Sequence, residues 1–368
     1  MNTIKELIEK YCPNGVEYKK LGEVCTVLRG KRLTKKELSG GGPFPVFHGG
    51  IEPIGYYCKG NRQAESVMII DVGASAGTVG YCKNEFWSSD GCFCLSHVST
   101  LEQRYLFFLL QSLERNLKSK VRRAGIPTLD NKVFENLLIP VPPLPVQREI
   151  VRILDSFTSL EAELEAELEA RRKQYEYYRD QLLSFKHLSG GGKNEVEWKT
   201  LGEVATKISS GRNKEKLSEG IFPVYGSTGI IAYSNSYQFD RELILVARVG
   251  ANAGFVNIAN GKYDVSDNTL IIEPNEDTSL KYLFYVLQNM NINKFAKGGG
   301  QPLITASLIK KLRIPLPPLS TQRRIVSVLD RFESLVNDIS TGLPAEIAAR
   351  HQQYEYYRDQ LLSFKRKS

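Results

Sequence analysis

The sequence "KQYEYYRDQLLSFK" at residues 173–186 decides the architecture, because it returns at residues 352–365 as "QQYEYYRDQLLSFK". Thirteen of the 14 aligned positions are identical. In the first copy Tyr175, Leu182 and Phe185 are separated by steps typical of one apolar helix face. The same helix is therefore written twice, which indicates an internal repeat.

Further similar segments occur in the same order in both halves of the chain. They are "LGEV" at 21–24 and 201–204, "FPVF" at 44–47 and "FPVY" at 222–225, "VGASAG" at 72–77 and "VGANAG" at 249–254, and "IPVPPLPVQREIVRILDSF" at 139–157 and "IPLPPLSTQRRIVSVLDRF" at 314–332. The common order indicates a tandem duplication in which each copy is a domain followed by a helix.

This pattern predicts an α+β protein with two tandem mixed α/β domains. The segments "SVMIIDVG" and "ELILVARVG" are typical of strands that end in glycine turns, and "EQRYLFFLLQSLERNLKSK" is typical of a helix. The predicted boundaries are a first domain at residues 1–143, a central helix at 144–188, a second domain at 189–318 that begins with a glycine-rich linker at 189–194, and a C-terminal helix at 319–368.

The first long helix, predicted over residues 146–186, would measure about 60 Å. A narrow apolar stripe of this length favours a second helix packed along it, and the second copy supplies one. The alternative is that each helix packs on its own domain. In the second copy Gly342 and Pro344 should kink or interrupt the helix, and four additional residues lie between Phe332 and Leu343.

The composition is that of a globular protein, with 42% hydrophobic and 24% charged residues. No apolar run approaches the roughly 20 residues that span a bilayer. The first residues also lack an apolar signal core, so we expect a cytoplasmic protein without a membrane partner. Six cysteines without a CxxC pair and four histidines without HxxxH spacing predict reduced thiols and no metal site.

The formal net charge of +8 is concentrated on the two predicted domains. Residues 1–145 carry 19 basic and 14 acidic side chains, and residues 188–317 carry 15 and 12. The central helix, residues 146–187, has an acidic excess, with 7 basic and 9 acidic side chains. A basic excess on two separate blocks favours a polyanionic partner.

Motifs for catalysis are absent from the sequence. The Pro-Pro pairs in "VPPL" and "LPPL" have apolar neighbours, which cannot hold the exocyclic amine of a flipped base as an amino-methyltransferase loop does. "GASAGTVG" lacks the GxGxxG spacing, and "EYK" and "EWK" lack the upstream aspartate of a nuclease site. These observations predict a protein that binds rather than an enzyme, and no cofactor.

Two variable domains, each followed by a helix that ends in "QYEYYRDQLL" and preceded by "IPxPPL", resemble the specificity (S) subunits of type I restriction–modification enzymes. The resemblance covers nearly the whole chain. It implies that each domain is a target recognition domain that reads one half of a bipartite site in double-stranded DNA. It also implies that the two helices form an antiparallel coiled coil, which docks two methyltransferase (modification) subunits and the restriction (nuclease/translocase) subunits. The catalytic chemistry would belong to these partners.

Three pairs of loops are the candidate DNA contacts. They are "RGKRLTKKEL" with "SGRNKEKL", "FHGG" with "YGSTG", and "KSKVRRAGIP" with "NKFAKGGGQP". Arg, Asn and Gln can read base edges, whereas Lys mostly contacts phosphates. The base-edge candidates are Arg32, Arg122, Arg123, Arg212, Asn213 and Gln301; the phosphate candidates are Lys31, Lys35, Lys36, Lys120, Lys214, Lys216, Lys294 and Lys297; the close-approach candidates are His48, Gly49, Ser227 and Thr228. Solvated charged turns are the alternative interpretation of these loops.

Two tyrosines are candidates for contact with a partner subunit. Tyr177 lies about 200° around the helix from Tyr175, and Tyr356 has the same position in the second copy. These side chains therefore lie off the packed stripe. Packing against a recognition domain is the alternative.

Other functions remain compatible with the sequence. The main alternative is a non-catalytic coiled-coil scaffold whose two repeated domains bind proteins. An RNA-binding protein is disfavoured because the aromatic residues form no stacking-platform motif. An enzyme with an unfamiliar site is the third alternative.

Overall fold

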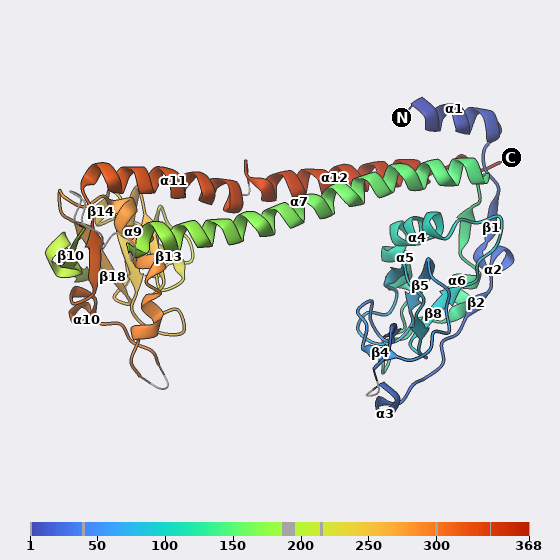
Figure 1. Ribbon diagram of the computed structural model, residues 1–368, viewed down its shortest axis with the longest axis horizontal. Coiled ribbons are helices and arrows are strands. Elements are labelled where there is room, and N and C mark those ends of the chain that lie inside the picture. Colours follow the sequence, from blue (N-terminus) through green and yellow to red (C-terminus); the bar gives the residue numbers. More distant parts are fainter. Residues whose placement is uncertain are drawn as a thin grey trace. The chain divides into compact units, whose positions relative to one another are not determined.

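The computed structural model describes residues 2–38, 41–185, 196–213, 216–298, 301–338 and 340–367. The predicted linker at 189–194 and Lys214 lie outside these residues. The chain forms two compact units (Figure 1). The first combines Met1–Glu165 with Glu346–Ser368, and the second is Ala166–Ala345.

The first unit contains one mixed α/β domain. Its strands are β1 (Tyr18–Lys20), β2 (Val27–Leu28), β3 (Phe44–Phe47), β4 (Gly55–Tyr57), β5 (Ser66–Ile70), β6 (Val79–Cys82), β7 (Trp87–Ser88), β8 (Cys92–Leu95) and β9 (Leu138–Pro140). Its helices are α1 (Asn2–Tyr11), α2 (Leu21–Val24), α3 (Lys35–Leu38), α4 (Gln103–Ser112), α5 (Glu114–Ser119) and α6 (Asn131–Glu135). One sheet has the strand order β2-β8-β5-β6 and a second has the order β4-β3-β7.

The second unit repeats this domain. Its strands are β10 (Glu197–Thr200), β11 (Ala205–Ser210), β12 (Phe222–Gly226), β13 (Gly229–Ser234), β14 (Phe239–Asp240), β15 (Leu243–Ala247), β16 (Val256–Ala259), β17 (Lys262–Val265), β18 (Thr269–Pro274) and β19 (Arg313–Leu316). Its helical segments are α8 (Leu201–Val204), α9 (Leu280–Asn289), η1 (Ile292–Phe295) and α10 (Ala306–Lys310). The sheet orders β11-β18-β15-β16 and β13-β12-β17-β14 match those of the first unit, with β14 added.

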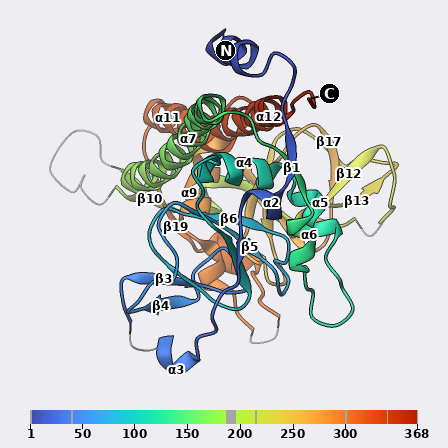
Figure 2. The same ribbon diagram turned by 90° about the vertical axis from the view of Figure 1, so that its right-hand side faces the viewer.

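The core of each domain forms where one amphipathic helix covers the larger sheet. In the first domain every residue of β5 is buried, as expected for a central strand with apolar side chains on both faces. Helix α4 packs on β5 and β6 through Tyr105, Leu106 and Leu109, and Figure 2 shows α4 above these strands. Helix α9 packs on β15, β16 and β18 in the same way. The predicted α+β class is therefore confirmed.

The long helices begin and end close to the predicted residues. Helix α7 is continuous over Leu144–Ser184. In the second copy, α11 (Leu319–Asn337) ends before α12 (Leu343–Leu362) begins, so the interruption predicted at Gly342 and Pro344 is confirmed. A Cβ atom on Gly342 would lie 2.5 Å from the carbonyl oxygen of Ser334, which explains the glycine at this break. No helix among the described residues is both long and apolar enough to cross a membrane.

Within each unit, α7 packs against a segment of the second copy. In the first unit Phe157 stacks on Tyr357 with ring centroids 5.4 Å apart, and Glu161 Oε1 lies 3.3 Å from His351 Nδ1. Residue numbers rise along one helix as they fall along the other, so the segments are antiparallel. In the second unit Tyr178 of α7 stacks on Phe332 of α11.

The two copies of the repeated helix pack on exchanged domains. Tyr354, in the copy that ends the chain, is buried in the core of the first domain, and its hydroxyl donates to Gln111 Oε1 at 2.9 Å. Tyr175, in the central copy, is buried in the core of the second domain. Val16 and Lys365 also pair through a backbone hydrogen bond of 2.8 Å. Each domain is therefore completed by the helix that follows the other domain.

Candidate nucleic-acid interface

Two candidate loops of the first domain flank one turn, residues 88–91. The backbone N–H of Lys31 donates to Ser88 O at 2.9 Å, and Trp87 Nε1 donates to Lys31 O at 2.7 Å. On the other side, Gly91 N donates to His48 Nδ1 at 3.2 Å. The Nδ1 atom of His48 also lies 3.2 Å from Asp90 Oδ1. Nδ1 of His48 therefore lies between a donor, the backbone N–H of Gly91, and an acceptor, the carboxylate of Asp90.

The third candidate loop meets these two at the end of β5. Arg122 N donates to Thr128 O at 2.9 Å, and Gly73 N donates to Pro127 O at 2.9 Å. Leu129 N donates to Asp71 O at 2.7 Å. Asp71 N also donates to Gly91 O at 3.3 Å, so the segment 71–73 links the loop that carries Arg122 to the turn at 88–91, which His48 contacts. We call this segment with its three surrounding loops the loop hub.

The second domain builds the same loop hub from different side chains. Asn213 N donates to Val265 O at 3.0 Å, as Lys31 does to Ser88. Gly250 N donates to Pro302 O at 3.0 Å, as Gly73 does to Pro127. Lys297 and Leu303 exchange backbone hydrogen bonds of 3.1 and 2.8 Å, as Arg122 and Thr128 do. The duplication has therefore preserved the backbone of the hub while its side chains changed.

The structure brings some of the predicted DNA contacts together and leaves others apart. The residues on or beside the hubs are Lys31, Arg32, His48, Gly49, Arg122, Arg123, Arg212, Asn213, Ser227, Thr228, Lys297 and Gln301. Helix α3, which carries Lys35 and Lys36, packs on β4 instead. Lys294 lies on η1, and Lys216 precedes a bridge to β13. Lys120 caps the C-terminus of α5.

Exposure separates the candidates further. The exposed side chains are Lys31, Arg32, Lys36, Lys120, Arg122, Arg123, Arg212, Lys216, Thr228, Lys294, Lys297 and Gln301. Asn213 is half-buried, and its Nδ2 already donates to Asp264 Oδ2 at 2.6 Å. Its second amide N–H is not used by this bond and its buried Oδ1 accepts no hydrogen bond, so the donor and acceptor that read adenine are not taken up by Asp264.

Two charged residues of the hubs were not among the candidates. Asp71 directly follows β5 and is only 7% exposed, and its Oδ1 has no hydrogen-bond partner. Burial raises the pKa of Asp71 to about 6. Arg248 follows β15 at the equivalent position. The alignment of "DVGASAG" with "RVGANAG" carried the signal, because it reverses the charge inside an otherwise similar segment.

The tyrosines of the repeated helix divide into buried and exposed members. Tyr175 and Tyr354 are 8% and 5% exposed, and burial raises the pKa of each to about 12. Tyr177 and Tyr356 are 61% and 62% exposed. The two candidate partner contacts therefore lie on the surface of their units.

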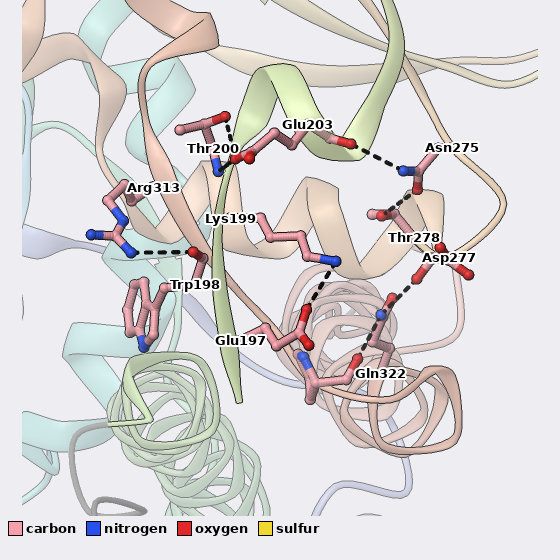
Figure 3. Close-up of polar contacts among 11 residues, drawn as sticks. Glu197, Trp198, Lys199, Thr200, Glu203, Asn275, Asp277, Thr278, Arg313 and Gln322 are labelled. Carbon is pink, nitrogen blue, oxygen red and sulfur yellow. Dashed lines mark hydrogen bonds and ion pairs between the residues drawn. The ribbon is translucent and has the colours of Figure 1, made fainter. Parts of the chain in front are cut away.

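A buried glutamine fixes each long helix to its domain. In Figure 3 Gln322 lies beside Asp277, and its Nε2 donates to the carbonyl oxygens of Asp277 and Pro317 at 3.0 and 2.8 Å. Its Oε1 accepts from Ser279 N, the N-cap of α9, at 2.8 Å. These bonds satisfy backbone groups at the point where the helix leaves the domain.

Within the described ranges, no group of three or more His, Cys, Asp and Glu residues could hold a metal ion.

A duplicated domain with basic loops defines a class of binding proteins, and comparison with known proteins identifies the family. The chain matches the family described as "Type I restriction modification DNA specificity domain" twice, at residues 13–170 and 193–349. The chain therefore belongs to the type I restriction–modification specificity subunits, which are non-catalytic DNA-recognition components.

Two curated relatives and a solved structure agree with this assignment. The specificity subunit of the type I restriction enzyme EcoR124I/EcoR124II from Escherichia coli is 37% identical over 66% of this chain and 63% of its own length. The EcoprrI specificity subunit from Escherichia coli is 30% identical over 75% of this chain and 73% of its own. The fold is similar to that of a crystallised S subunit from M. genitalium, with a TM-score of 0.65 and 17% identity over 95% of this chain and 96% of that chain.

Proposed function

We propose that this chain reads a bipartite site in double-stranded DNA and carries the modification and restriction subunits of a type I complex. The observation that carries the proposal is the repetition of one loop hub in two domains, with the same backbone hydrogen bonds and different side chains. A backbone that is the same in both domains, with side chains that differ, suits two domains that recognise different half-sites.

In this proposal each predicted segment of the chain has its own role. Residues 1–143 and 189–318 are target recognition domains, and residues 144–188 and 319–368 form an antiparallel coiled-coil spacer. The antiparallel contacts within each unit, such as Phe157 with Tyr357, support this assignment. A rigid spacer between two DNA-binding domains sets the separation and register of the two half-sites that they recognise.

The proposed partners are two methyltransferase subunits. Tyr177 and Tyr356 are exposed and equivalent, so they offer the same side chain to two identical partners. In each unit the neighbouring stripe residue, Tyr175 or Tyr354, is buried. The exposed tyrosine therefore remains available for another chain, and restriction subunits would join the resulting complex.

The test uses the full chain expressed with a methyltransferase partner. We expect the purified complex to methylate a library of random duplexes only at one pair of short sequences with a fixed gap. The chain without its partner should give no methyl transfer from S-adenosylmethionine. Stable association with partner proteins but no sequence preference in the library would instead support the scaffold function.

A further inference from the structure

Asp71 and Arg248 occupy the same backbone position in the two hubs. Asp71 N donates to Gly91 O at 3.3 Å, and Arg248 N donates to Asn268 O at 2.9 Å. Asp71 O accepts from Leu129 N at 2.7 Å, and Arg248 O accepts from Ile304 N at 2.8 Å. The fold therefore places an acid and a base at one equivalent position, and its backbone does not require either side chain.

The carboxylate of Asp71 lacks the hydrogen bond that its burial calls for. Its Oδ1 is buried and accepts no hydrogen bond, although Arg29, His48 and Asp90 are the charged groups that face it. A buried acceptor without a hydrogen bond destabilises the folded protein, because it loses its bonds to water and gains none in return. Such a group persists where it serves a function, because a neutral apolar side chain would remove the cost.

The residues beside Asp71 and Arg248 differ, and His48 in the first hub corresponds to Gly226 in the second. Gly49 and Gly91 lie on either side of the β5 end, where a Cβ on Gly49 would lie 3.3 Å from Val72 O and one on Gly91 would lie 2.6 Å from Val72 Cγ1. The equivalent residues beside Arg248 are Ser227 and Asn268. The two glycines therefore make room for Val72, the residue that follows Asp71.

We propose that Asp71 and Arg248 determine which base each domain prefers at the matching position of its half-site. Asp71 accepts a hydrogen bond from the exocyclic amine of a cytosine or an adenine, which supplies the donor missing at Oδ1. Arg248 donates to guanine O6 and N7, as guanidinium groups commonly do in the major groove. This inference rests on the proposed DNA-reading function.

The test compares Asp71→Asn, Asp71→Ala and Arg248→Gln with the wild-type chain, each in complex with the methyltransferase partner. Selection from a duplex library with random half-sites gives the base preference at every position. We expect Asp71→Ala and Arg248→Gln each to lose about tenfold or more of discrimination at one position of its own half-site, because each removes a base contact. Asp71→Asn keeps an acceptor oxygen and should lose less. Arg248→Gln should shift that position towards adenine, the base that glutamine reads.

Controls separate reading from folding. Ser75→Ala and Asn252→Ala lie on the same two turns, and both should keep the wild-type preference. Melting temperature identifies a variant that fails to fold. If the Asp71 variants do not fold, Arg248→Gln in the second domain gives the decisive comparison, because Arg248 is only half-buried. Folded variants with unchanged preferences, or with a uniform loss on all sequences, would overturn the inference. A wild-type complex without any preferred bipartite site would instead contradict the proposed function itself. The base that the wild-type complex selects at this position, cytosine or adenine, shows which exocyclic amine donates to Asp71.

Discussion

Gln147 and Gln322 make the same three hydrogen bonds in the two units. Gln147 Oε1 accepts from Glu102 N at 2.8 Å, while its Nε2 donates to Thr100 O at 3.0 Å and Pro142 O at 2.7 Å. Gln322 repeats this pattern, and both side chains are fully buried. The joint between domain and helix is therefore preserved more closely than the loops that face outward.

Replacing Gln147 by leucine should destabilise the first unit. The substitution keeps the side-chain volume similar but leaves one buried N–H and two carbonyl groups without this partner, so the free energy of unfolding should fall by about 2–4 kcal/mol. Urea denaturation measures the change, and Gln322→Leu should give a similar loss in the second unit. The neighbouring exposed substitution Arg148→Gln is the control and should change stability little. Equal stability of Gln147→Leu and Arg148→Gln would show that the buried bonds contribute nothing net.

Loss of both exposed tyrosines should weaken assembly more than folding. Tyr177→Ala with Tyr356→Ala removes side chains that are more than 60% exposed, so the melting temperature should change by only a degree or two. Titration with the methyltransferase subunit should show an affinity lower by about tenfold or more if each ring is a buried contact in the complex.

A matched buried variant sharpens this comparison. Tyr354→Phe removes the hydroxyl that donates to Gln111, so it should lower stability by about 1 kcal/mol and leave assembly unchanged. A double alanine variant that melts early but assembles normally when folded would place Tyr177 and Tyr356 in the packing of the units instead.

The stability of the first unit should depend on pH through Asp71. Burial raises the folded-state pKa of Asp71 to about 6, above the ordinary aspartate value of about 3.9, so the folded state holds its proton more strongly than the unfolded state. This contribution to stability is fully present below about pH 4 and is lost as pH rises to about 6. Asp71→Asn should remove that dependence and raise the melting temperature at pH 8. If the melting temperatures of the wild type and of Asp71→Asn change with pH in the same way, the raised pKa of a buried, unpaired Asp71 carboxylate is contradicted. Glu163→Gln, an exposed change on α7, is the control.

The length of α7 should set the gap between the two half-sites. The helix contains "LEAE" at residues 160–163 and again at 164–167, and one more copy would lengthen it by about 6 Å while rotating the following face by about 40°. Methylome sequencing of cells that carry this insertion should find the same two half-sequences separated by a longer gap, by nearly two base pairs.

A matched insertion without leucine, "AEAE" after Glu163, keeps the helix length and tests whether the apolar register matters as well. Unchanged spacing with full methylation would mean that the helices hold partners but do not measure DNA.

Local sequence patterns determined the duplication, the long helices and the break between α11 and α12. These features depend on repeats, on apolar spacing along one helix and on the local chemistry of Gly342 and Pro344, all of which can be read within a few residues. Hydrophobic periodicity also located the exposed Tyr177, because one helix fixes the direction of each of its side chains.

Tertiary structure alone decided which distant residues meet. The packing of Tyr354 on Gln111 joins residues 243 positions apart, and the meeting of His48, Asp71 and Arg122 at one strand end follows from the strand order of the sheets. Asp71 reads as an ordinary turn residue until the fold buries it, because burial depends on what packs from elsewhere in the chain. The sequence therefore determined the elements and their repetition, and long-range packing decided where the loops of the hub converge.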